Sequence, residues 1–253
     1  GLFSPSPNRE IIDGKNIKFV KKCSVCGEKS KKFDDDDYKK ILNVNKINVD
    51  RFPKNKYIAN SRINITPSTG ADNYDRIFTH RNQVALLILQ DAINSQDDSQ
   101  ERDVLEQVLV ASISLARIAM YGSSTDILYH VVGHGAQDMN VWMLFEEKYN
   151  SFCKFKKTYK TKQVGTTPTE VIIANKDYAE FIDENKDLKV DIIYTDFPYT
   201  DQVPYLERNQ LYRVWLEKFY DINYKLSPKM LEREIVLTNA DSRPEKREID
   251  NYY

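Results

Sequence analysis

One short apolar run constrains the fold more than any other feature of this 253-residue chain. The run extends from Val190 to Tyr194 and is followed at once by Asp196 and Pro198. Such a run, bounded by a turn signal, is typical of a strand buried in a parallel sheet. Open α/β sheets bind their ligands at the carboxyl ends of their strands. We therefore expect an α/β fold with Asp196 at the ligand-binding edge of a partial Rossmann-like sheet.

The residues after this strand carry a carboxylate, a rigid turn and an aromatic ring: Asp196, Phe197, Pro198 and Tyr199. They resemble the D-P-P-Y signature of amino-group DNA methyltransferases, which transfer a methyl group from S-adenosylmethionine to an exocyclic base nitrogen. The resemblance continues through residues 195–216, TDFPYTDQVPYLERNQLYRVWL. This sequence is similar to the pattern T-D-P-P-Y-x-D-x-x-x-Y-x-E-L-x-x-x-W of zinc-ribbon-containing, adenine-specific DNA methylases.

The resemblance implies a role for each residue of the motif. A flipped adenine would donate its two amino hydrogens to the Asp196 side chain and to the backbone carbonyl of Phe197. Tyr199 would stack on the base, a contact worth about 1–3 kcal/mol, and Pro198 would fix φ in the loop. Phe197 departs from the family, which has Pro there, so the turn loses rigidity. The alternative is an ordinary strand-to-loop turn in another Rossmann-like protein.

Two further segments resemble the same family. Residues 78–82, FTHRN, are similar to its F-T-x-R-N-L segment, and residues 140–142 are similar to its N-V-W. Arg81 and Asn82 could contact DNA or cofactor. The plainer interpretation is an amphipathic helix capped by Thr79. This helix is expected whether or not Arg81 and Asn82 contact a ligand.

The cofactor site is only partly represented in the sequence. The resemblance implies that Asp177, in the turn after an expected strand at residues 169–175, binds the adenine of S-adenosylmethionine. The chain has 8 glycines, and none of them forms the D-P-F-x-G-x-G loop that holds the methionine part of the cofactor. In the family this loop lies upstream of the zinc ribbon. We therefore expect an upstream portion of the same protein to carry it.

A Cys-x-x-Cys-Gly sequence at Cys23, Cys26 and Gly27 is typical of a zinc knuckle, because the glycine permits a tight turn that directs both thiolates at one ion. It provides half of a tetrahedral structural zinc site. The only other cysteine is Cys153, and the resemblance places the second pair upstream. A metal-free remnant and a redox motif are the alternatives.

A lysine-rich segment follows the third of four longer predicted helices. Those helices are expected at residues 80–93, 99–121, 138–152 and 203–220, with a shorter one ending near residue 182. The lysines, interleaved with aromatic residues, are Lys154, Lys156, Lys157, Lys160 and Lys162. We expect the first four to bind DNA phosphates, with a solvated linker as the alternative.

Composition limits the remaining function classes. The chain has 37 Lys and Arg against 38 Asp and Glu, so DNA affinity must come from local patches. Three cysteines favour a reducing compartment, and we expect the cytoplasm. No apolar run reaches the roughly 18 residues of a membrane span. We expect a knuckle segment at 1–50, a helical region at 51–165 and a partial methyltransferase region at 166–253.

The expected function is thus transfer of a methyl group from S-adenosylmethionine to N6 of adenine in DNA, in a restriction-modification or defence system. The expected partners are DNA and the upstream portion of the protein, and zinc is the expected structural metal. The alternative is a catalytically incompetent DNA-binding or assembly module of the same lineage.

Overall fold

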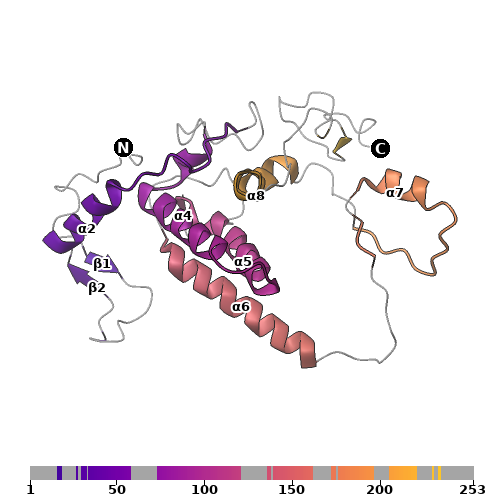
Figure 1. Cartoon of the computed structure of the whole chain (residues 1–253), viewed down its shortest axis with the longest axis horizontal. Helices are drawn as coiled ribbons and strands as arrows, with labels where there is room; N and C mark the ends of the chain where they lie inside the picture. The colour runs from indigo at the N-terminus through magenta and orange to yellow at the C-terminus, as the bar shows by residue number, and fades with distance from the viewer. Residues whose placement is uncertain are drawn as a thin grey trace.

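The structure is a computed structural model, and most of the residues it describes are helical (Figure 1). The described residues are 16–18, 27, 30–32, 34–57, 73–120, 136–137, 139–161, 172–174, 176–196, 205–220, 230 and 233–234. None of the helices in these ranges is long and apolar enough to cross a membrane.

A bundle of four helices forms the core of the described structure. Its members are α4 (His80–Asn94), α5 (Gln100–Ala116), α6 (Val141–Thr161) and α8 (Tyr205–Phe219). Helix α5 is central, because it contacts α4, α6 and α8. Apolar residues three or four positions apart on these helices form the buried stripes that meet in the core. The fully buried residues include Leu86, Leu109, Ile113 and Trp215.

Helix starts follow the capping residues in the sequence. Thr79 caps α4, and its hydroxyl accepts a hydrogen bond from the backbone N–H of Asn82 at 3.2 Å, as predicted. Helix α2 (Asp35–Asn45), which contacts α4, begins with a capping box between Asp34 and Asp37. The hydrogen bond from Asp37 and the ion pair with Lys31 lower the pKa of the Asp34 carboxyl to about 2.

The prediction of an α/β fold is wrong. Within the described ranges the strands are two or three residues long and pair only two by two, both times antiparallel. Strand β1 (Asn16–Lys18) pairs with β2 (Ser30–Lys32), and β3 (Ala119–Met120) pairs with β4 (Ala136–Gln137). No parallel sheet is present among these residues, and the chain is mostly helical there.

The run from Val190 to Tyr194 is not a buried strand. Residues 188–190 and 192–196 have no regular secondary structure, and the side chains of Ile192 and Tyr194 are 84% and 94% exposed. Residues 172–174, expected to lie in the preceding strand, are also irregular. A parallel strand needs hydrogen-bonded neighbours and covered faces, and no described residue provides either here. Only the short helix between the two segments is confirmed, as α7 (Tyr178–Glu184).

The described part of the lysine-rich segment, residues 154–161, is helical rather than a linker, and Lys162 lies outside the described residues. The sequence of α6 contains neither glycine nor proline and is rich in lysine, which favours helix. Its first half is anchored by the buried side chains of Val141, Leu144 and Phe145.

Candidate functional site

The motif that contains Asp196 is divided between an exposed segment and a buried helix. Asp196 is exposed and is the last described residue before α8. Phe197, Pro198 and Tyr199 lie outside the described residues. Their proposed contacts with a base therefore stay predictions.

Helix α8 contains residues 205–216 of the resembling stretch, and several of these residues lie in the core. Glu207 and Leu211 are each 2% exposed, and Trp215 is fully buried. The Trp215 ring lies edge-on to Phe52, with ring centroids 5.6 Å apart. Trp215 therefore anchors α8 to the bundle rather than contacting a ligand.

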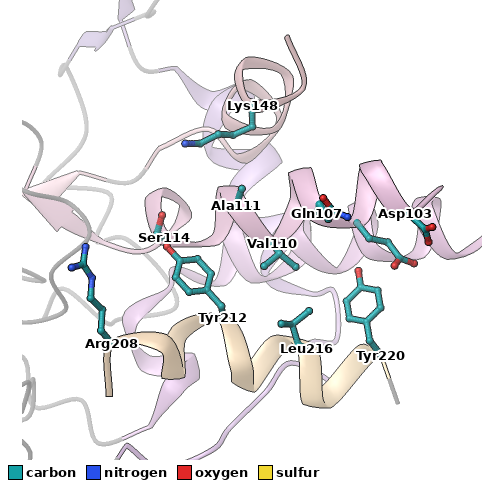
Figure 2. Close-up of a pocket in the computed structure, with 11 residues that line it drawn as sticks. Asp103, Gln107, Val110, Ala111, Ser114, Lys148, Arg208, Tyr212, Leu216 and Tyr220 are labelled. Carbon is teal, nitrogen blue, oxygen red and sulfur yellow. The ribbon is translucent and has the colours of Figure 1, made fainter. Parts of the chain in front are cut away.

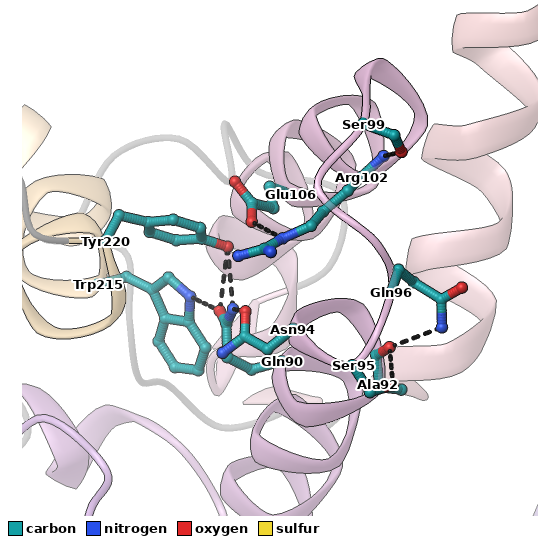
Figure 3. Close-up of polar contacts among 10 residues, drawn as sticks. All are labelled: Gln90, Ala92, Asn94, Ser95, Gln96, Ser99, Arg102, Glu106, Trp215 and Tyr220. Atoms are coloured by element: carbon teal, nitrogen blue, oxygen red, sulfur yellow. Dashed lines mark hydrogen bonds and ion pairs between the residues drawn. The ribbon is translucent and has the colours of Figure 1, made fainter.

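A buried polar network fixes this tryptophan to α4 (Figure 3). The indole Nε1–H of Trp215 donates to Oε1 of Gln90 at 2.9 Å, and the Gln90 amide donates to Asn94 at 2.9 Å. The hydroxyl of Tyr220 lies 3.1 Å from the same amide. Burial raises the pKa of Tyr220 to about 12, so the hydroxyl stays protonated at neutral pH. The sequence does not single out Gln90, because a lone glutamine in a helix has no distinguishing pattern.

Asp177 has partners within the chain. Its Oδ1 accepts from the backbone N–H of Ala179 at 2.9 Å and so caps α7, and its Oδ2 lies 2.8 Å from Nη2 of Arg233. Glu234, which follows Arg233, accepts a 2.9 Å hydrogen bond from the backbone N–H of Leu206 in the first turn of α8. Residues 233 and 234 thus connect α7 with α8. The cofactor role of Asp177 stays a prediction.

The FTHRN segment has a structural function. The Asn82 side-chain amide is buried and donates to the carbonyl oxygens of Ala116 at 2.7 Å and Met139 at 2.9 Å. It therefore ties the start of α4 to the end of α5 and to the residues before α6. Its neighbour Arg81 is exposed in the first turn of α4. Both amide hydrogens of Asn82 are used inside the protein.

Cys23 and Cys26 lie outside the described residues, in the segment that joins β1 to β2. Gly27 has a φ of 72°, in the left-handed region that favours glycine. This conformation agrees with the tight turn expected after the cysteines. No group of three or more potential metal ligands occurs among the described residues.

The exposed half of α6 combines positive charge with aromatic rings. Lys154, Lys156 and Lys157 are exposed, and the rings of Phe155 and Tyr159 are paired with centroids 5.3 Å apart. These rings are 58% and 69% exposed, so their faces are accessible from solvent.

The Lys156 ammonium lies 5.9 Å from the ring centroid of Phe152, which is one turn earlier in α6. Position 160 lies on the same helix face as position 156, because the two are four residues apart. The side chain of Lys160 is outside the described residues. Lysines beside exposed rings are suited to a ligand with both phosphates and aromatic bases.

Comparison with known proteins finds no relative. No protein-family model, no curated protein and no solved structure matches this chain. The class that the described residues define is a helical bundle with a projecting basic helix and an exposed irregular segment ending at Asp196.

Proposed function

We propose that this chain is part of an S-adenosylmethionine-dependent methyltransferase acting on N6 of adenine in DNA, with Asp196 holding the acceptor amine. The observation that carries the proposal is the division of one continuous motif. The residues around Trp215 are buried in the bundle, whereas Asp196 is exposed just before the same helix. Functional side chains on a loop held by a rigid element are a common arrangement in enzymes.

In this proposal the motif holds the target adenine in position for methyl transfer. Asp196 and the carbonyl of Phe197 accept the two hydrogens of the adenine amino group, which localises the nitrogen lone pair for attack. Tyr199 replaces the stacking that the flipped base loses, worth about 1–3 kcal/mol. Phe197 retains the carbonyl that this role requires, because the contact is made by the backbone.

The described residues do not by themselves form a site for the methyl donor. The carboxylate of Asp177 is already used by α7 and Arg233, and the sequence has no cofactor glycine loop. We therefore assign that loop to another portion of the protein, with zinc held by Cys23, Cys26 and two ligands from that portion. The low cysteine content agrees with action in the cytoplasm, in restriction-modification or a related defence system.

The exposed half of α6 supplies the DNA contact in this proposal. Lys154, Lys156, Lys157 and Lys160 neutralise phosphates and release counterions, a contribution independent of base sequence. Phe155 and Tyr159 are available for stacking on unpaired bases. The net charge of −1 makes such a local patch necessary, since the whole chain does not attract DNA.

The test is methylation of plasmid DNA by the complete protein, with N6-methyladenine measured by mass spectrometry after digestion to nucleosides. Asp196→Ala should lower the rate by about 10²-fold or more, because the acceptor amine loses its oriented acceptor. Asp191→Ala is the matched control, since Asp191 is an exposed carboxylate five residues earlier in the same segment. It should leave the rate within about twofold. Equal rates for the two variants would refute the role of Asp196.

A DNA-binding or assembly module without catalysis is the second candidate. The observation that favours it is the absence of a sheet around residues 188–196 in the described structure, together with Phe197 in place of proline. This candidate predicts salt-sensitive DNA binding by the complete protein and no methylated adenine or cytosine in the same digest.

A further inference from the structure

An open groove of about 840 Å³ runs between α5 and α8, with Lys148 of α6 above it (Figure 2). Its apolar part is formed by Val110, Ala111, Tyr212 and Leu216. Ala111 is exposed on this face of α5. None of the residues assigned to base or DNA binding lines the groove, so it is separate from the proposed methyl-acceptor site.

The groove has the dimensions of a helix-binding surface. Its α5 wall contains positions 103, 107, 111 and 114, and its α8 wall contains positions 208, 212, 216 and 220. Spacings of three and four residues place each row on one helix face. At 1.5 Å per residue each row extends about 17 Å, or three turns. Two helices side by side with a shallow apolar floor are a common receptor for a third helix.

The charges of the groove are ordered along its length. Figure 2 shows the Lys148 ammonium toward the Ser114 end and the Asp103 carboxylate at the opposite end. Neither Lys148 nor Asp103 forms an ion pair with any residue that the structure describes, whereas the nearby Glu106 is paired with Arg102 at 3.1 Å. The groove therefore presents an available positive charge at one end and an available negative charge at the other.

We propose that this groove binds an amphipathic helix of a partner protein, with an acidic first turn at Lys148 and a basic last turn at Asp103. Helices favour acidic residues in the first turn and basic residues in the last, because of the helix dipole. The order of charges therefore sets the direction of the bound helix, antiparallel to α5 and parallel to α8. A nucleic acid fits poorly at this end of the groove, since the Asp103 carboxylate would repel its phosphates. The inference does not depend on the methyltransferase proposal.

Fluorescence anisotropy with two labelled peptides tests the proposal on the full chain. The first is an amphipathic peptide of about four turns, with two Glu in its first turn, a stripe of Leu and two Lys in its last turn. The second has the same composition with the Glu and Lys positions exchanged. The first peptide should bind at least about tenfold more tightly, because only its charges match the groove. Equal affinities, or no binding of either peptide, would overturn the proposal.

Groove variants locate the binding site. Ala111→Trp should abolish binding by filling the exposed floor, and the double variant Asp103→Lys with Lys148→Glu should prefer the second peptide. Lys218→Glu is the control, because Lys218 is exposed on α8 and does not line the groove. Circular dichroism confirms that each variant is folded. Unchanged binding by a folded Ala111→Trp variant, or displacement of the peptide by duplex DNA or S-adenosylmethionine, would contradict a helix-binding groove.

Discussion

The four-helix bundle and the segment ending at Asp196 contain similar residue types in very different surroundings. Ile113 and Trp215 in the bundle are fully buried, whereas Ile193 and Tyr194 are 79% and 94% exposed. Each bundle helix has a neighbour that covers its apolar stripe. No strand pairs with residues 188–196 among the described residues. Apolar character therefore predicts burial only where a second element is available to cover it.

Within this one motif, different residues contribute to stability and to the proposed chemistry. Trp215 contributes to the core through its ring and through its hydrogen bond to Gln90. Asp196 contributes nothing visible to packing, and its side chain faces solvent. Substitutions in the bundle should thus lower stability. Substitution of Asp196 should lower only the proposed activity.

The largest loss of stability is expected for Trp215→Ala. The substitution removes a fully buried ring and leaves Gln90 without its indole donor, so the free energy of unfolding should fall by about 3–5 kcal/mol. The measurement is urea denaturation followed by circular dichroism.

Trp142→Ala is the matched control, because that ring is 60% exposed on α6. It should change stability by less than about 1 kcal/mol. Similar losses for both variants would show that burial does not distinguish these two tryptophans.

An intermediate effect is expected for Asn82→Ala. The variant leaves the carbonyl oxygens of Ala116 and Met139 without their donor, which should cost about 1–3 kcal/mol of stability. Asn150→Ala is the control, since Asn150 is exposed on α6. Thermal unfolding of the two variants should separate them clearly. An Asn82→Ala variant as stable as the unmodified protein would show that these two hydrogen bonds do not contribute to stability.

The smallest effect, and one confined to DNA binding, is expected from the lysines of α6. The triple change Lys156→Ala, Lys157→Ala and Lys160→Ala should reduce the slope of log K against log salt by about 1 per phosphate contact, with base preference unchanged. Stability should hardly change, because Lys156 and Lys157 are exposed. The measurement is DNA affinity over a series of salt concentrations.

The control for this triple is an equal loss of charge elsewhere. Three exposed lysines in and after α2 serve this purpose: Lys39, Lys40 and Lys46. Their replacement by Ala should leave the salt slope as it is. If both triples reduce the slope alike, DNA binding reflects overall charge and the projecting part of α6 has no special role.

The sequence alone determined where the bundle helices begin, although the helix expected at 99–121 ends at Ala116. The cap at Thr79, the helices from residue 80 and from residue 100, and the helix containing Trp215 were all predictable. Their hydrogen bonds join residues four apart, so the information lies within each segment. The motif also singled out Asp196 and Trp215, although it did not distinguish an exposed residue from a core anchor.

Only the tertiary structure decided which segments acquire neighbours. The run at residues 190–194 has the composition of a strand, yet a strand is stabilised by hydrogen bonds to distant residues, which its own sequence does not specify. The lysine-rich segment became helix because α6 was already anchored by Val141, Leu144 and Phe145. The bond between Gln90 and Trp215 spans 125 residues. Contacts at such separations depend on how the helices pack, because no local pattern in the chain records them.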